Sequence, residues 1–562
     1  MNDLEYQVSY VVIAVDRILS QIDLDPLSPT YGCAHLAYWR DKTSDVADMR
    51  RQEAMLTLSL VYARSYPCSP WEKDKRIIHA VNALVAFWAA QQNADGSFDE
   101  WYKGERGFAA TAFTAHAAAR TLALVGEYLD LAVRGRAQTA LRKAANWLAK
   151  HDDLFKANHQ AVAVCALAWC AKVLADDAYR TAALKKYESI AAVQRAEGWF
   201  PEVGNVDIGY TFLTAEYLAM AMALGGEWPH RECAVRAFDF ACNWLDAHLI
   251  LGEEYGICRN PYVSRIAIVL LAPHSRYAAS LLGALEKHSV GFEGVRPILA
   301  DELRLNRWAY LPLLAYDYYT ELAAQATVWA NEKEIPCADR TARTQCFHDA
   351  GLIRISQRDY SAVFAPATGG LLRLFGRAHG DCITDVGYVL GRSGAQATNY
   401  VYNRKNTFTE TADGFETTCM IVRAKKILPS YWMRVLLRCA CSTAVGARFS
   451  RSLIDAYRLR KGTALNQSGS NVGARRSAGR LYRKITLRDD SVIIDDVLTC
   501  ECGVHSEDIF ACSGRNEPYP VVRDLSCLVR IPAGKCFRLS LRKIYRIVNG
   551  AWVYTADLQS AE

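Results

Sequence analysis

Two adjacent residues, Asn158 and His159, stand where an apolar helical stretch begins, in KANHQAVAVCALAWC. An amide and an imidazole at a helix N-terminus bring two hydrogen-bond donors beside the positive end of the helix dipole. Asparagine is also a favoured N-cap, which is the structural alternative. The pair therefore predicts either an anion-binding site or an ordinary helix cap.

A polar, glycine-containing loop, EGWFPEVGNVDIGYTFLTAEYLA (197–219), leads into a second helical stretch. It holds Trp199, Glu202 and Tyr210, and Tyr210 stands 51 residues after His159. A tyrosine close to cationic or amide groups would lose its proton more easily and could serve as an acid or a base. The alternative is a half-buried packing residue at a loop–helix junction.

A third polar loop, QQNADGSFDEWYKGERGFAATAF (91–113), mixes aromatic and charged residues. Rings can stack on sugar faces and charges can hold acidic groups, so this composition is typical of a saccharide groove. The residues expected to contact substrate are Trp101, Tyr102, Glu105 and Arg106, joined from the second loop by Trp199 and Glu202. The alternative is a loop that only caps the next helix.

In the second half of the chain, LLRLFGRAHGDCITDVGYVLG (371–391) places Arg377, His379 and Asp381 between two apolar runs typical of strands. A histidine at a strand end with an aspartate nearby could be an oriented general base. Arg377 is a further candidate for substrate binding.

These residues must be positioned by two different kinds of structure. From residue 5 to about 330, apolar residues recur at three- and four-residue spacing, which predicts ten to twelve helices. Repeated helical hairpins of this length often close into an α/α toroid. From about 350, short alternating runs bounded by Gly, Asn, Asp and Ser predict an antiparallel β-sandwich. We therefore expect an α+β chain with a helical toroid domain over 1–335 and a β-sandwich domain over 345–562.

Composition limits where and with what the protein works. The 562 residues are 51% hydrophobic, no apolar run approaches the length of a membrane span, and the N-terminus carries acids rather than a signal peptide's basic stretch. The 18 cysteines are scattered without metal-binding spacing, so reduced cysteines in a cytoplasmic protein are expected. Residues 341–562 hold 32 Lys and Arg against 19 Asp and Glu, a balance that suits an anionic ligand.

The order of these motifs resembles that of the heparinase II/III-like polysaccharide lyases, which include alginate lyases and heparinases. In that family an Asn-His pair opens a helix, a catalytic tyrosine follows some fifty residues later, and the β domain adds a histidine. The N-terminal string DPLSPTYGCAHLAYWRDKTSD (25–45) is also similar to the opening of relatives found with bacterial surface-polysaccharide genes. The chain departs from the pattern at Arg377, where many relatives have a second histidine, and in DIGY, where better-known lyases have SPMYH.

The resemblance implies cleavage of a uronate-containing acidic polysaccharide by β-elimination. Asn158 and His159 would neutralise the uronate carboxylate, and Tyr210 would return a proton to the leaving oxygen. In a syn elimination Tyr210 would also take the C5 proton, and His379 would be the alternative base. The scheme requires neither a metal ion nor a cofactor. The expected partner is an acidic polysaccharide or oligosaccharide, with no nucleic acid and no membrane insertion.

Two alternatives use the same scaffold. A glycoside hydrolase needs two facing carboxylates, and the candidates are Glu100, Glu105, Glu202 and Asp207. A non-catalytic glycan-binding or assembly protein would keep the aromatic loops without needing Tyr210. A terpene cyclase is disfavoured because the paired acids Asp489-Asp490 and Asp495-Asp496 lie in the strand-rich half and fit neither DxDD nor DDxxD.

Overall fold

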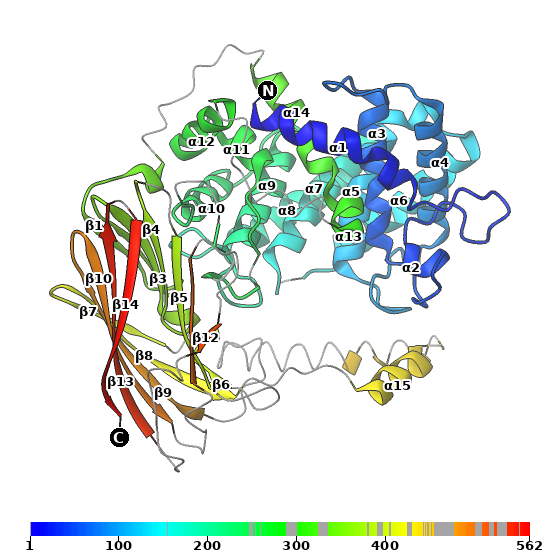
Figure 1. Ribbon diagram of the computed structural model, residues 1–562. Coiled ribbons are helices and arrows are strands. Elements are labelled where there is room, and N and C mark those ends of the chain that lie inside the picture. The colour runs from blue at the N-terminus through cyan, green and yellow to red at the C-terminus, as the bar shows by residue number, and fades with distance from the viewer. Residues whose placement is uncertain are drawn as a thin grey trace.

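The computed structural model describes residues 2–153, 155–246, 251–252, 255–258, 260–287, 301–323, 335–378, 382–390, 397–403, 406–423, 430–441, 443, 445–446, 449–450, 452–453, 477–500, 509–515, 522–524, 537–549 and 551–561. Helices occupy the first part of the chain and antiparallel strands the second, and the two parts lie side by side (Figure 1). The order of structure types predicted from the sequence is therefore confirmed.

Fourteen α-helices precede residue 330 among the described residues, slightly more than the ten to twelve predicted, because several are short. They are α1 (Asp3–Leu19), α2 (Leu36–Trp39), α3 (Ala54–Ala63), α4 (Lys75–Ala90), α5 (Phe108–Val125), α6 (Leu131–Lys150), α7 (Ala157–Leu174), α8 (Asp177–Ala191), α9 (Ile208–Met222), α10 (Glu232–Cys242), α11 (Arg265–Leu271), α12 (Arg276–Lys287), α13 (Glu302–Trp308) and α14 (Tyr310–Ala323). A 3-10 helix, η1 (Met49–Glu53), precedes α3.

Six of these helices form an inner ring: α3, α5, α7, α9, α11 and α14 each pack against the next, and α14 packs against α3. The helices α4, α6, α8, α10, α12 and α1 lie against them from outside. Helices α3, α5, α7 and α9 are buried along almost their whole length, so their sequences are apolar on every side. The outer helix α6 instead buries residues at three- and four-residue spacing, from Val133 to Leu148.

The sequence was expected to hold no stretch long and apolar enough to span a membrane, but one helix of the inner ring is such a stretch. The segment Phe108–Tyr128 is long and apolar enough to cross a bilayer, but 78% of its most apolar stretch is buried inside the protein. A helix enclosed by other helices needs the same composition as one enclosed by lipid.

The strands form one continuous antiparallel sheet in the order β1-β2-β3-β4-β5-β6-β8-β9-β10-β13-β14, with β7 paired to β8, and β11 paired to β5 and β12. Their bounds are β1 (Arg343–Phe347), β2 (Leu352–Ser356), β3 (Tyr360–Ala365), β4 (Leu371–Gly376), β5 (Cys382–Leu390), β6 (Ala397–Thr398), β7 (Phe408–Thr411), β8 (Gly414–Arg423), β9 (Ser477–Leu487), β10 (Ser491–Cys500), β11 (Ile509–Arg515), β12 (Val522–Asp524), β13 (Phe537–Val548) and β14 (Ala551–Ala561). One helix, α15 (Tyr431–Cys441), lies between β8 and β9 in sequence.

The two halves of the sheet share an apolar core. Residues from β2 to β5, such as Ile353, Phe364 and Leu374, pack with residues from β8 to β14, such as Phe415 and Tyr545. Alternate residues of the first half, including Leu352 and Val363, join the core of the helical part instead. Strands β2 to β4 are therefore covered on both faces, and β2 and β3 are buried at every position, including the polar Arg354 and Ser356.

Polar contacts fix the sheet to the helices next to the loop that precedes α9. The Glu197 carboxylate accepts the backbone N–H groups of Asp349 and Ala350 at 2.8 and 2.9 Å. Phe347 packs edge-on against Trp244 at a centroid distance of 5.0 Å. The turn between β1 and β2 therefore holds the start of the 197–207 loop.

A buried ionic network ties the two halves of the sheet together. Arg483 on β9 pairs with Asp385 on β5 and Asp496 on β10 at 3.0 and 2.8 Å, and Lys543 on β13 contacts both carboxylates. Tyr545 donates a further hydrogen bond to Asp385. Despite burial, these cations hold the pKa of both carboxyl groups below the ordinary value.

Two adjacent aspartates on β10 provide a matched test of this network. Asp496→Asn removes one of the two buried carboxylates that pair with Arg483 and Lys543. The free energy of unfolding should therefore fall by about 3–5 kcal/mol. Asp495→Asn removes only the exposed pair with Arg542, and the loss should be about 1 kcal/mol or less. Urea denaturation followed by circular dichroism measures both, and equal losses would contradict the role of the network.

Candidate functional site

Asn158 and His159 lie in the first turn of α7, as predicted, but neither is its N-cap. The cap is Lys156, whose side chain makes no capping hydrogen bond. Asn158 is buried, and its amide Nδ2 donates to Glu202 Oε2 at 2.6 Å. The asparagine therefore reaches across to the loop before α9 instead of closing its own helix.

The loop before α9 is held against the start of α7 by its backbone. Val203 N–H donates to the Phe155 carbonyl at 2.6 Å, and Glu202 forms an isolated antiparallel bridge with Lys156. Asp207 then caps α9 by accepting the Tyr210 N–H at 3.1 Å. Since α7 and α9 are neighbours in the inner ring, Asn158, His159, Glu202 and Tyr210 come from adjacent first turns and the loop between them.

The Glu202 carboxyl group is the most perturbed acid of this region. It is 2% exposed, and its Oε1 has no hydrogen-bond partner among the described residues. Burial raises the pKa of Glu202 to about 8, and the nearby Asp207 and Asp153 carboxylates act in the same direction. Glu202 is therefore largely protonated at neutral pH and carries an O–H donor that no protein group in the described structure uses.

His159 is oriented by a carboxylate. Its Nδ1 lies 2.8 Å from Asp153 Oδ2, and its ring meets Phe113 edge-on at 6.3 Å. Burial lowers the pKa of His159 below its ordinary value, despite the opposing effect of Asp153. A neutral imidazole that donates through Nδ1 presents a lone pair at Nε2. This geometry suits a proton acceptor, whereas the sequence reasoning assigned His159 to donate to an anion.

Tyr210 also differs from the expectation of an easily ionised hydroxyl. Burial raises its pKa above the ordinary value, and the neighbouring Glu202 adds to the effect. Its side chain remains partly exposed, and no hydrogen bond of its hydroxyl occurs within the described part of the chain. Tyr210 therefore holds a proton that it can donate.

Sequence reasoning missed Arg50, which lies on η1. Its guanidinium stacks over the Phe113 ring at 3.6 Å, its Nε pairs with Glu53 at 2.7 Å, and its Nη2 has no partner in the described structure. Arg50 and His159 both contact the Phe113 ring, and the charge of Arg50 opposes the rise in the pKa of Tyr210. The available signal was a charged run, DMRRQE, directly before an apolar helix. We name Arg50, Asn158, His159, Glu202 and Tyr210 the candidate catalytic cluster.

Only part of the aromatic loop before α5 is available to a ligand. Trp101 is 63% exposed, whereas Tyr102 and Glu105 are buried. The Glu105 carboxylate accepts the backbone N–H groups of Glu100 and Trp101, so it shapes the loop. Arg106 pairs with Asp95 at 3.0 Å. Trp101 is therefore the clearest candidate for stacking on a sugar, and the assignment of Glu105 to substrate is replaced by a structural role.

Trp199 was expected to contact substrate, but it is fully buried and its indole donates to Glu197 at 3.1 Å. Its ring lies in the interior because apolar side chains pack between this loop and the sheet. The assignment of Trp199 as a stacking surface is therefore wrong for this structure.

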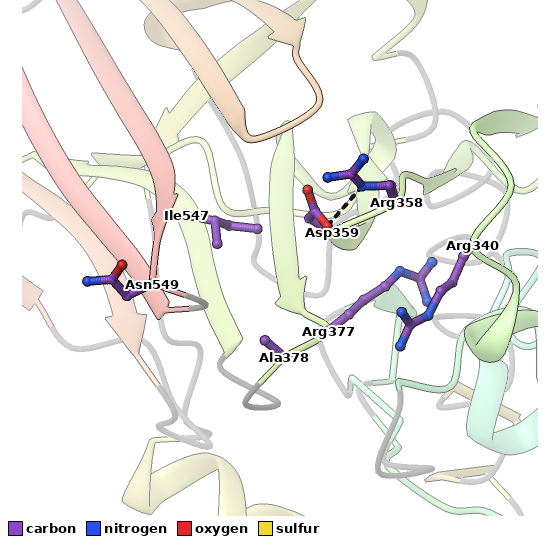
Figure 2. Close-up of a pocket in the computed structure, with 7 residues that line it drawn as sticks. All are labelled: Arg340, Arg358, Asp359, Arg377, Ala378, Ile547 and Asn549. Carbon is purple, nitrogen blue, oxygen red and sulfur yellow. Dashed lines mark hydrogen bonds and ion pairs between the residues drawn. The ribbon is translucent and has the colours of Figure 1, made fainter.

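Arg377 is the one β-side candidate among the described residues. The Arg377 guanidinium donates to the carbonyls of Gln357 and Cys337 at 2.9 and 2.8 Å, so it pins neighbouring turns. It also lines a pocket of about 330 Å³, where Figure 2 shows it beside Arg340, with Arg358 next to Asp359. No member of the candidate catalytic cluster lines this pocket. His379 and Asp381 lie outside the described residues.

The fold is similar to that of known proteins. The family described as Ulvan lyase N-terminal domain matches residues 58–200, which include Asn158 and His159. The chondroitin AC lyase of Streptomyces coelicolor A3, solved with chondroitin sulphate, gives a TM-score of 0.54 at 10% identity over 98% of this chain and 76% of that chain. A Paenibacillus xanthan lyase gives 0.53 at 8% identity over 98% of this chain and 52% of that one. No curated protein matches the chain.

A heparinase III structure gives a TM-score of 0.45 at 9% identity, over 90% of this chain and 73% of that chain. The family match and the fold shared with the chondroitin and xanthan lyases confirm the resemblance to polysaccharide lyases predicted from the sequence.

The raised pKa of Glu202 gives a prediction for stability. Its carboxyl group binds a proton more tightly in the folded chain, at about 8, than at the ordinary value of 4.5. The protonated carboxyl group therefore stabilises the folded chain, and this stabilisation is fully present below the ordinary pKa. It is lost as pH rises through about 8. Relative to Glu202→Gln, the parent's free energy of unfolding should fall by about 1.4 kcal/mol per pH unit between about pH 5 and 8. Denaturation at several pH values measures this difference, and parallel curves would contradict it.

Proposed function

We propose that this chain, which resembles polysaccharide lyases in its fold and its family match, cleaves a uronate-containing acidic polysaccharide by β-elimination. We also propose that the ring of helices is the α/α toroid of such enzymes, and that the two halves of the sheet form their β-sandwich. The observation that carries the function is the candidate catalytic cluster. It supplies a proton acceptor, a proton donor and neutral or cationic donors for a carboxylate from the first turns of α7 and α9, the loop before α9 and η1.

The first chemical task is to make the C5 proton of a uronate acidic. Removal of that proton places negative charge on the carboxylate, and donors aimed at developing charge usually supply the largest catalytic effect. The protonated Glu202 carboxyl and the Asn158 amide can both donate to such a group, and the Arg50 cation adds a favourable field. A neutral Glu202 is essential here, because an ionised one would repel the substrate carboxylate.

The second task is proton transfer. His159 Nε2 accepts the proton from C5, and the C5–H electron pair forms the C4–C5 double bond as the C4–O bond breaks. Tyr210 donates its hydroxyl proton to the departing oxygen. The products are an unsaturated sugar and a new chain end. The imidazolium and the tyrosinate that remain are reset when a proton passes from one to the other through water. These reaction steps need no metal ion.

The glycoside hydrolase is the second candidate, because the raised pKa of Glu202 is the property expected of its general acid. The candidate for its catalytic partner is Asp207, the carboxylate that raises the pKa of Glu202 most. Asp207 is buried, however, and accepts the backbone N–H groups of Tyr210 and Cys258 at 3.1 and 2.9 Å. A carboxylate held in this way is occupied with capping α9, which favours the lyase.

Substitution of Tyr210 tests the proposed elimination. Tyr210→Phe should lower turnover by a factor of about 10² to 10⁴, because it removes the proton donor for the leaving oxygen. Turnover is followed by the ultraviolet absorbance of the C4–C5 double bond on chondroitin sulphate, xanthan, ulvan and alginate.

The matched control is Tyr179→Phe, which removes a hydroxyl that donates to Asn146 on another pair of helices. It should leave turnover unchanged. A hydrolase would lose activity with Glu202→Gln and keep it with Tyr210→Phe. Absence of any double-bond product on all four polymers would favour a non-catalytic glycan-binding protein.

Trp101 should contribute to binding rather than to chemistry. If its exposed ring stacks on a sugar, Trp101→Ala should raise KM about fivefold, the equivalent of about 1 kcal/mol, with kcat unchanged. The control is Trp432→Ala, at another exposed tryptophan, on α15. Initial rates over a range of polymer concentrations separate the two constants, and an unchanged KM for Trp101→Ala would remove the loop from the binding site.

A further inference from the structure

Three side chains that the proposed reaction does not use meet at the edge of the sheet. They are Cys346 on β1, His348 just after β1, and Glu410 on β7. The thiol sulfur, an imidazole nitrogen and a carboxylate oxygen all lie within 4.8 Å of one another. The Cys346 thiol already donates to Glu410 Oε1 at 3.2 Å.

The fold holds these groups in place through different elements. Cys346 and His348 are two residues apart, and Cys346 packs against the apolar core between the sheet halves. Glu410 belongs to the β7–β8 hairpin, where it pairs with Phe415. The His348 ring stacks on Phe408, two residues before Glu410, at a centroid distance of 5.1 Å and an interplanar angle of 8°. The stacking fixes the orientation of the imidazole toward its two neighbours.

The donor set identifies the class of ion. Sulfur, nitrogen and oxygen ligands together suit zinc and similar divalent transition metals, whereas calcium and magnesium prefer oxygen alone. Zinc bonds of about 2.0–2.3 Å in a tetrahedron place ligand atoms roughly 3.3–3.8 Å apart, so only small side-chain movements are needed.

We propose that Cys346, His348 and Glu410 form a binding site for a zinc-class divalent metal ion, which fastens the β7–β8 hairpin to the turn after β1. The three ligands leave a fourth position for water. The cysteine enters as a thiolate, so binding releases its proton to solvent and tightens as pH rises.

The site has a structural consequence for the rest of the protein. The residues that follow His348 are Asp349 and Ala350, whose N–H groups hold the Glu197 carboxylate. A metal ion at His348 therefore stabilises the turn that anchors the 197–207 loop. Its expected effect is on the stability of the β part and its junction with the helices, since none of the three ligands belongs to the candidate catalytic cluster.

The experiment uses the full chain, stripped with a chelator and then titrated with Co²⁺ and Zn²⁺. The parent should bind one Co²⁺ with a thiolate-to-metal band in the near ultraviolet and visible bands of tetrahedral strength. Zn²⁺ should displace it and raise Tm. Cys346→Ser should abolish the thiolate band and the rise in Tm, while Cys68→Ser, at an exposed cysteine elsewhere, should preserve both.

His348→Ala provides a second variant at an exposed position, in case Cys346→Ser fails to fold. It should weaken Co²⁺ binding at least tenfold and shift the visible bands. A parent that shows no thiolate band, or a His348→Ala variant that binds Co²⁺ with the parent's spectrum and affinity, would overturn the proposal.

Discussion

The hydrogen bond between the Asn158 amide and the Glu202 carboxyl is the interaction on which the candidate site depends. It joins the first turn of α7 to the loop before α9 at 2.6 Å, in surroundings where Glu202 is almost fully buried. An ionised carboxylate there would be strongly disfavoured, so burial raises the pKa of Glu202 and favours its protonated form. The same loop then positions Tyr210, through the Asp207 cap, in the first turn of α9. If the loop moved, the donor, the acceptor and the carboxylate-binding groups would separate together.

The larger architecture makes this arrangement possible. Inner helices that are buried on nearly all sides can carry polar groups without large desolvation only near their ends, so the chemistry gathers at first turns and connecting loops. Adjacent helices of the ring bring two such turns together. The sheet contacts the start of the same loop, because the Glu197 carboxylate binds the turn between β1 and β2. The buried network around Arg483 ties the two halves of that sheet together.

The sequence predicted elements of structure better than it predicted environments. Helical periodicity followed by strand alternation is a local property, and so is the position of Asn158 at a helix start; both predictions agree with the structure. Burial is set by tertiary contacts, so the exposure assumed for Trp199 and the easily lost proton assumed for Tyr210 were wrong. Arg50 acts on His159 from a distant segment of the chain, and the proposed ligands Cys346 and Glu410 are 64 residues apart. Spacing along the chain carries no signal for such pairs.

The most direct test of the account is the source of oxygen in the products. The parent protein would be incubated with chondroitin sulphate, xanthan, ulvan and alginate in water enriched in heavy oxygen, and the oligosaccharides weighed by mass spectrometry. Elimination breaks the C4–O bond without adding water, so the account predicts products that carry no heavy oxygen from cleavage and an unsaturated sugar at each new end. Fragments that gain one water molecule bearing the heavy isotope would show hydrolysis and contradict the assignment of His159, Tyr210 and Glu202.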